Sequence, residues 1–484
     1  TFNGRRAART FDLSPAYFAR AGKPRPALSR QGARVSAGEG HVAGGNTIHF
    51  QGRMVYDRIG RDTDGDGVND IPAQTVGVDR ILVEIMDLDP IDDEVMWSGR
   101  TDSDGYFDVT INWDAWEDPD IYVRWECDTG TVNVQESGVL EEDYSWSTKD
   151  TAYFPDFAGS EIDFGELSPT ASGDHPALHI FNSIVRAHRF IETRANLDVP
   201  EVDVQWPDED AGGGDNAKYV GDEIFMSTAK QWREDTHIHE YGHHFLEHFA
   251  PTPDADYCNG ICDGGPAPDC PNPGHCIWCP ERALDAWSEG WPNWLADVVT
   301  RSYPADYGYV ALFTSNQERT RICDQDGDGV ADDLDGDGTP DAADPMLIEG
   351  FIGALLRDIE DDIEDQDNDG VPDVQSRCAR DVLSLGVEEI FEVVNVDEPI
   401  RPLAFINAFR ARFPQHTNAL WQTANNVAPE FTWSDLQPPG PVTELDSPTH
   451  PLGVGGTLPY IEIELTPPAD DASGADGRYS YTWS

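Results

Sequence analysis

The residues in this chain that are best suited to chemistry lie in the segment HIHEYGHHFLEHF, residues 237–249. His239 and His243 are four positions apart, so on a helix their imidazoles project from one face and can hold a single metal ion. Glu240 follows His239 directly, which places its carboxylate near a metal-bound water rather than on the metal. The segment therefore predicts a helical metal site with a general base beside it.

The same segment carries an apolar stripe. Ile238, Tyr241, Phe245 and Phe249 recur at helical spacing and predict a buried side next to the metal-binding side. Gly242, which has no side chain, would permit a close neighbour at the centre of this helix. A buried stripe argues against the alternative, which is a solvated helix that binds metal adventitiously.

That alternative arises because five of the 13 histidines fall within residues 237–248. We expect His237, His244 and His248 to be supporting or surface groups rather than ligands. A catalytic zinc site needs three protein ligands and one open position, so the third ligand must come from elsewhere. Downstream, the predicted helix ALDAWSEGWPNWLAD, residues 283–297, places Glu289 among aromatic side chains.

Together, a His-Glu-x-x-His motif and a later Glu-Gly-Trp resemble the gluzincin metallopeptidases, with the fungalysin-like peptidases a near comparison. The resemblance covers roughly residues 170–430 and is specific at these two motifs. It implies that His239, His243 and Glu289 are zinc ligands and that Glu240 is the general base and acid of peptide-bond hydrolysis. A bound zinc ion would polarise the peptide carbonyl and lower the pKa of its water to about 7.

The chain departs from that family at the group that orients a ligating histidine. Related enzymes commonly carry Asp four residues beyond the third ligand, where this chain has Asn293. An amide oxygen can still accept a hydrogen bond from an imidazole, but without charge. Asp285 and Asp297 are alternatives for this role. The strand expected at 219–227 resembles the edge strand with which such enzymes pair an extended peptide substrate.

Four Asp-rich segments predict calcium sites: DTDGDGVND, DQDGDGVAD, DLDGDGTPD and DQDNDGVPD. In each, Asp at positions 1, 3 and 5 supplies hard oxygen ligands and Gly at position 6 allows a sharp turn. They resemble thrombospondin type 3 repeats better than EF-hands, because position 12 is not Glu. Acidic solubilising loops are the alternative. The candidate calcium ligands are Asp62, Asp64, Asp66, Asp70, Asp324, Asp326, Asp328, Asp332, Asp333, Asp335, Asp337, Asp341, Asp365, Asp367, Asp369 and Asp373.

These sites need elements to position them, and the pattern predicts a multidomain α+β chain. Apolar or alternating runs between residues 45 and 150 predict an antiparallel β-sandwich, and GRTDSDGYFDVTI, residues 99–111, resembles transthyretin-like, carboxypeptidase-regulatory-like modules. Helices are expected at 174–195, 230–249, 281–301, 346–364, 380–395 and 402–412. The expected division is a basic arm (1–44), the sandwich (45–165), a zincin domain (166–435) with insertions at 251–280, 323–344 and 365–373, and a linker with a partial immunoglobulin- or fibronectin-like segment (436–484).

Cysteine usage favours an oxidising compartment, since the total of eight is even. Cys258, Cys262, Cys270, Cys276 and Cys279 crowd into one loop, and a structural zinc knuckle built from four of them is the alternative to disulfides. The other three could complete disulfides: Cys323 with Cys378, and Cys127 with the odd cysteine of the loop.

Charge excludes two classes of partner. The 484 residues hold 91 acidic and 32 basic groups, a formal net charge of −59, which would repel nucleic acid and anionic membranes. The sequence has no run of 18 apolar residues, so no membrane span is predicted. The arm at 1–34 has eight basic residues against one Asp, and it is either a tether or a floppy terminus.

The sequence thus predicts a secreted, calcium-stabilised zinc metallopeptidase acting on a protein or peptide substrate. The alternative is an extracellular surface, adhesive or self-assembling protein that uses a metallopeptidase-like scaffold and binds a surface partner or its own copies. We also expect the native chain to continue past Ser484, because about 44 residues after the Pro-rich linker are too few for a complete sandwich of about 100.

Overall fold

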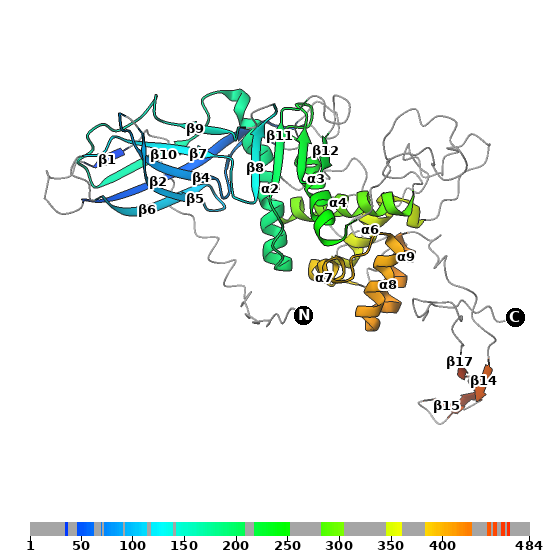
Figure 1. Cartoon of the computed structure of the whole chain (residues 1–484). Helices are drawn as coiled ribbons and strands as arrows, with labels where there is room; N and C mark the ends of the chain where they lie inside the picture. The colour runs from blue at the N-terminus through cyan, green and yellow to red at the C-terminus, as the bar shows by residue number, and fades with distance from the viewer. Residues whose placement is uncertain are drawn as a thin grey trace, which may run out of the picture.

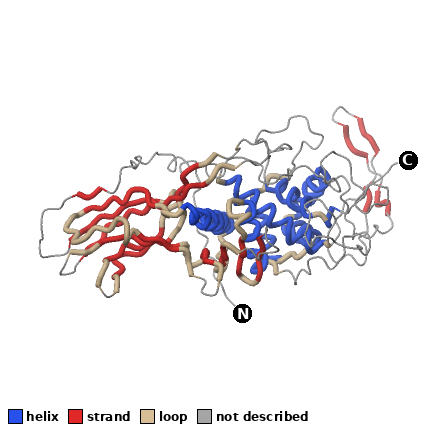
Figure 2. Tube along the Cα trace, turned by 90° about the horizontal axis from the view of Figure 1, so that it is seen from above, coloured by secondary structure: helices blue, strands red, loops and turns tan. Residues whose placement is uncertain are grey.

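The chain is a mixed α+β protein, as the sequence predicts at that level (Figure 1). The computed structural model describes residues 34–36, 46–61, 69, 72–90, 92–113, 118–138, 142–208, 217–251, 282–303, 345–360, 383–427, 443–446, 449–452, 456–459 and 462–464. Strands gather at one end of the molecule and helices at the other, and helix α2 (His175–Ala195) lies between them (Figure 2).

Two sheets form the strand-rich end. The first has the order β1-β10-β2-β3, with β6 also paired to β2, and the second has the order β5-β4-β7-β9. Every pair in these sheets is antiparallel, as expected, except β10 with β2, which is parallel. The strands are β1 (Arg34–Ser36), β2 (Asn46–Arg58), β3 (Gln74–Gly77), β4 (Leu82–Asp87), β5 (Glu94–Arg100), β6 (Tyr106–Trp113), β7 (Ile121–Glu126), β9 (Ser145–Ser147) and β10 (Glu161–Leu167).

Apolar side chains from both sheets enter one core. Phe50 on β2 and Phe164 on β10 stack with ring centroids 6.2 Å apart, while Val83 on β4 and Val123 on β7 are fully buried in the same cluster. Trp97 on β5 stacks on Phe107 of β6, which joins the two sheets directly. Burying these faces is the main stabilising contribution that this end of the chain can make.

A third sheet lies next to the helices and has the order β12-β13-β11-β8. Its strands are β8 (Val132–Glu136), β11 (Val202–Trp206), β12 (Ala217–Val220) and β13 (Glu223–Met226). β8 falls inside the stretch expected to belong to the sandwich, yet it pairs in parallel with β11. The two parts of the chain are therefore joined through a shared sheet as well as through α2.

The single strand expected at 219–227 is wrong. The chain turns back at Gly221 and Asp222, which both adopt positive φ (61° and 68°), and β12 and β13 form an antiparallel hairpin. Gly takes this left-handed conformation without cost and Asp tolerates it, so the Gly-Asp pair could have indicated the turn.

The expected helices are confirmed, although their ends differ from the predicted ends by up to seven residues. Helix α9 was not predicted from the sequence. They are α2, α3 (Glu234–Phe249), α4 (Ala283–Ser302), α6 (Glu349–Glu360), α7 (Val387–Asp397), α8 (Pro402–Arg412) and α9 (Thr417–Val427). α2 contacts β2 and β8 on one side and α3, α4 and α7 on the other.

Because residues 175–188 of α2 are all buried, the polar side chains among them need partners. The Tyr56 hydroxyl lies 3.0 Å from His179 Nδ1, and the amide oxygen of Asn182 accepts a hydrogen bond from the backbone N–H of Asp79 at 2.9 Å. The helix predicted at 174–195 is thus buried over most of its circumference, polar side chains included.

Near the C-terminus, the described strands form two small antiparallel pairs. They are β14 (Thr443–Asp446) with β17 (Glu462–Glu464), and β15 (Thr449–Leu452) with β16 (Gly456–Pro459). All four strands fall within the segment 436–484, where the sequence predicts a linker and a partial β domain. The immunoglobulin- or fibronectin-like character of this segment stays a prediction.

Candidate metal centre

Helix α3 carries the His-Glu-x-x-His motif. Three of the four residues of its apolar stripe are buried as expected, since Ile238, Tyr241 and Phe245 are fully inaccessible to solvent, while Phe249 is only partly buried. Two acidic residues, Glu234 and Asp235, lie in its first turn, where their negative charge interacts favourably with the positive end of the helix dipole. The opposite side of α3 carries His239 and His243, whose side chains are only 12% and 13% exposed.

Helix α4 brings the third candidate ligand to α3. Three tryptophans of α4, Trp287, Trp291 and Trp294, are fully buried and hold the helix in the core. Trp291 stacks almost parallel on Phe245 of α3, with ring centroids 4.8 Å apart. Glu289 is thereby held against the histidines at 2% exposure.

The donor atoms of the three residues converge. His239 Nε2 lies 3.1 Å from Glu289 Oε2 and 3.1 Å from His243 Nε2, and His243 Nε2 lies 3.4 Å from Glu289 Oε2. Ligands placed about 2.0–2.1 Å from a tetrahedral zinc ion are roughly 3.3 Å from one another. The separations fit a shared ion, and the three side chains can hold a metal.

Asn293 orients one of these ligands. Its Oδ1 lies 2.8 Å from His239 Nδ1, and because a carbonyl oxygen can only accept, the imidazole donates from Nδ1. The proton of the neutral ring is then on Nδ1, so Nε2 presents its lone pair to Glu289 and His243. Among the candidates that the sequence left for contact with a histidine of the motif, Asn293 is the one that makes this contact.

Asp285 does not take that role, and its expected position beside the metal ligands is wrong. Its carboxylate accepts two hydrogen bonds from the Arg282 guanidinium, at 2.6 and 2.9 Å, one turn earlier in the chain. The other alternative, Asp297, pairs with Arg301 at 2.8 Å and Arg357 at 3.5 Å. Burial would raise the pKa of Asp297, but these two guanidinium groups outweigh burial and lower it.

Close packing of α3 on α4 fixes the geometry of the centre. A Cβ atom added to Gly242 would lie 2.8 Å from both Cα and Cβ of Pro292. The expectation that Gly242 admits a close neighbour is confirmed, and the neighbour is the residue before Asn293. Glu240 is 7% exposed on the same helix, one position after His239.

The remaining histidines of α3 have separate surroundings. His237 is fully buried with Nε2 2.9 Å from the backbone oxygen of Lys230, and burial lowers its pKa to about 3. His244 and His248, which the sequence suggested were not ligands, lie with Asp222 in a second group of side chains that could hold a metal. The second His pair at i and i+4 was the sequence signal for this group.

The hairpin changes which strand lies at the edge of this sheet. β13 is paired on both sides, with β11 and with β12, so it cannot accept a further strand. Within the described residues, β12 is the edge of this sheet. The unpaired edge is therefore residues 217–220, not the whole stretch 219–227 in which the sequence placed the edge strand.

Several expected sites lie outside the described residues, namely all sixteen candidate calcium ligands and seven of the eight cysteines. Cys127 is fully buried, and it has no disulfide partner within the described part of the chain. None of the helices in the described ranges has the length and apolar character needed to cross a bilayer.

The chain was compared with protein families, curated proteins and solved structures. No protein-family model matches the chain, and no curated protein matches it. Among solved structures, a 9R-lipoxygenase from Cyanothece PCC8801 is similar to 33% of this chain and 25% of its own, at 14% identity and a TM-score of 0.17. This chain thus spans about a quarter of that protein, and so small a likeness supports no statement about fold or function.

Proposed function

We propose that this chain is a secreted or surface-located zinc metallopeptidase of gluzincin type, with a zincin domain around α3 and α4. The observation that carries the proposal is the convergence of His239, His243 and Glu289 within 3.4 Å of one another. Two imidazoles and one carboxylate are the ligand set of a catalytic zinc that keeps an open position.

A zinc ion held by these residues would supply a Lewis acid and lower the pKa of its bound water to about 7. Glu240 is the residue that accepts the proton of the attacking water and delivers it to the leaving amine. Asn293 holds His239 in the tautomer that a ligand needs. The edge strand β12 offers backbone hydrogen bonds to an extended peptide, which would give affinity without sequence preference.

The rest of the chain has supporting roles in this proposal. The two sheets at the strand-rich end are interpreted as a transthyretin-like accessory module, and the four Asp-rich loops as structural calcium sites. The calcium loops, the disulfides and the extracellular location stay predictions from the sequence.

The test is the substitution Glu240→Gln. Removing the proton acceptor should lower the rate of casein or gelatin cleavage by roughly 10²–10⁴-fold, while zinc content measured by mass spectrometry stays at the wild-type level. Glu192→Gln, an exposed carboxylate on α2, is the control and should retain full activity.

Full activity in Glu240→Gln would refute the assignment of the general base. Zinc bound at His239, His243 and Glu289 without cleavage of any protein by the wild type would instead favour the scaffold alternative.

A further inference from the structure

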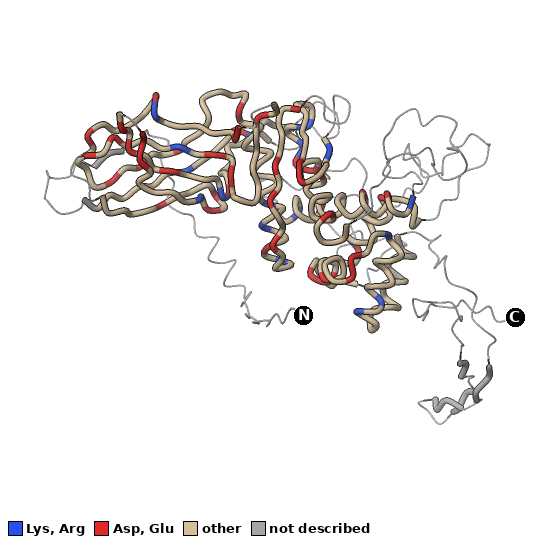
Figure 3. Tube along the Cα trace, viewed as in Figure 1, with Lys and Arg blue, Asp and Glu red and all other residues tan. Residues whose placement is uncertain are grey.

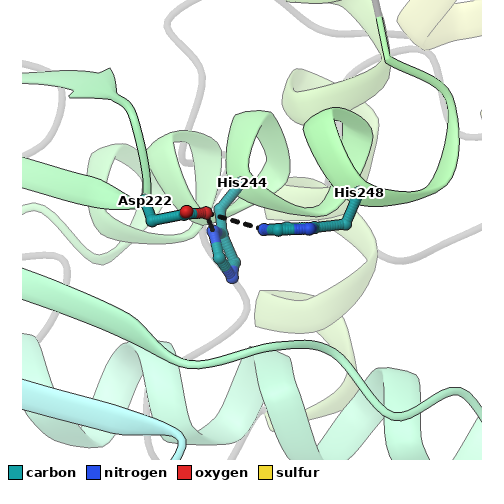
Figure 4. Close-up of side chains that lie close together, drawn as sticks. All are labelled: Asp222, His244 and His248. Carbon is teal, nitrogen blue, oxygen red and sulfur yellow. Dashed lines mark hydrogen bonds and ion pairs between the residues drawn. The ribbon is translucent and has the colours of Figure 1, made fainter.

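A second cluster of metal-binding side chains lies between the β12–β13 turn and α3 (Figure 4). Asp222 comes from the turn, and His244 and His248 come from successive turns of α3. Asp222 Oδ1 lies 2.7 Å from His248 Nε2 and 3.6 Å from His244 Nδ1. The cluster shares no residue with the group formed by His239, His243 and Glu289.

The backbone aims the Asp222 carboxylate at the helix. Gly221 and Asp222 both have positive φ, which reverses the chain within two residues. The backbone N–H of Asp222 donates to the Tyr219 hydroxyl oxygen at 3.1 Å, which closes the turn. The side chain of Asp222 remains 57% exposed and that of His248 27%, so an ion and its waters can reach them.

The hydrogen bonds of His244 leave a lone pair facing this carboxylate. His244 is fully buried, and its Nε2 lies 3.0 Å from the backbone oxygen of Pro200, which can only accept. The proton of the neutral ring is therefore on Nε2, and Nδ1 is an acceptor. In a metal-ligating histidine, the ring nitrogen that does not bind the metal usually donates a hydrogen bond to an acceptor such as a backbone carbonyl.

At the centre of the cluster, His248 Nε2 is close enough to donate to Asp222, at 2.7 Å, whereas among the described residues His244 Nδ1 has no donor nearer than the Tyr219 hydroxyl. The Tyr219 hydroxyl lies 3.4 Å from Asp222 Oδ1 and 3.4 Å from His244 Nδ1, and it has one proton to give. Both distances are long for a hydrogen bond from a hydroxyl group. A cation between the carboxylate and the two imidazoles would give the His244 Nδ1 lone pair a partner and would be bound by Asp222 and His248 as well.

We propose that Asp222, His244 and His248 bind a divalent transition-metal ion of the class that prefers imidazole and carboxylate ligands, such as zinc. Water completes its coordination on the exposed side. The ion fastens the β12–β13 hairpin to α3, and so fixes the edge strand against the helix that carries the first metal centre. This consequence for the edge strand rests on the proposed peptidase function, whereas the metal site itself does not.

The test counts zinc ions per chain. Wild-type protein is stripped of metal, returned to saturating calcium so that the Asp-rich loops are filled, equilibrated with excess zinc, desalted and measured by mass spectrometry. Asp222→Asn with His248→Ala removes two exposed ligands and leaves buried His244 in place, so the fold is retained. We expect this double variant to bind one zinc fewer than the wild type.

His49→Ala is the matched control. His49 also pairs with a carboxylate, at 3.0 Å from Asp108, but in the first sheet and without a second imidazole in the group. It should bind as much zinc as the wild type. Equal zinc content in Asp222→Asn/His248→Ala and wild type would overturn the proposal, as would the lack of an anomalous zinc peak at this cluster in a zinc-soaked wild-type crystal.

The two metal centres can be separated in the same assay. His239→Ala with His243→Ala should also lose one zinc, but a different one, and the peak at Asp222 should persist. If this second double variant loses no zinc, the proposed function fails while the outcome for Asp222 and His248 still decides the further site.

Discussion

At the scale of single residues, the first metal centre depends on which atom of each side chain faces inward. Asn293 decides this for His239, because an amide oxygen 2.8 Å from Nδ1 keeps the ring proton there. Its own Nδ2 is buried and has no hydrogen-bond partner within the described residues. The sequence identifies Asn293 as a departure from the motif pattern that it otherwise resembles, and the structure gives the residue a specific contact with His239.

Asn293→Ala should therefore weaken zinc binding by roughly 10–100-fold, the usual cost of losing a group that orients a ligating histidine. Asn293→Asp should bind zinc at least as tightly as wild type, because it keeps the acceptor and replaces an unpaired donor. Competition with a chromogenic zinc chelator measures both. Asp285→Asn, whose carboxylate pairs with Arg282 instead, should leave the affinity unchanged, and a loss there would contradict the assignment.

The grouping of His239, His243 and Glu289 was predictable because its signals are local. His239, Glu240 and His243 lie within one helical turn, and Glu289 lies in a distinctive aromatic segment. The second cluster was missed because the sequence, although it could indicate the turn at Gly221 and Asp222, does not show that this turn packs against α3. His244 and His248 also resemble surface histidines until the burial of His244 is seen.

At the scale of elements, the centre exists because α3 and α4 approach closely at Gly242 and Pro292. A similar contact joins α4 to α6, where a Cβ on Gly290 would lie 2.5 Å from the backbone oxygen of Glu349. Both glycines thus set helix separations that any larger side chain would increase. The helices themselves follow from periodicity, but the pairing of α3 with α4 does not.

Gly242→Ala should destabilise the protein by about 1–3 kcal/mol, the usual range for overpacking a core. The new methyl group meets the rigid ring and backbone of Pro292, so α4 must shift and carry Glu289 away from the histidines. We therefore expect a lower thermal midpoint together with weaker zinc binding. Gly173→Ala adds a methyl where no atom lies within 4 Å and should change neither quantity. Unaltered zinc affinity in Gly242→Ala would show that helix spacing does not control the centre.

At the scale of the whole molecule, most charged residues that the structure describes lie on the surface, but a few buried ion pairs connect segments that are far apart in the sequence. Acidic residues are distributed over the sheets and the helices alike (Figure 3), in keeping with a net charge of −59. A few carboxylates are buried instead. Glu234, at the first turn of α3, is 2% exposed and accepts a hydrogen bond from Arg61 at 2.8 Å, across 173 positions of sequence.

This pair joins the segment after β2 to the helix of the first metal centre, and His179 of α2 completes it with Nε2 3.5 Å from Glu234. Burial lowers the pKa of His179, so the ring is neutral near pH 7 and Arg61 provides the positive charge. No sequence pattern indicates such a contact, because each partner lies in an ordinary polar segment and only the tertiary fold brings them together.

The Glu234 contact should make the stability of the protein depend on pH in the acid range. Burial would raise the pKa of Glu234, but His179 and Arg61 outweigh burial and lower it to about 2, against 4.5 for the free side chain. The unfolded chain therefore binds the proton more tightly. The stability that the carboxylate contributes is complete above pH 4.5 and is lost as pH falls toward 2.

Glu234→Gln should be less stable than wild type at pH 7, since Arg61 loses its charged partner. Its urea midpoint should then fall less steeply than that of wild type between pH 5 and pH 3, because the variant has no carboxylate to protonate there. Comparing the two proteins at each pH cancels contributions from metal and calcium. Glu388→Gln breaks an exposed pair with Arg194 and should follow the wild-type slope. Parallel curves for wild type and Glu234→Gln would show that the buried pair does not control acid stability.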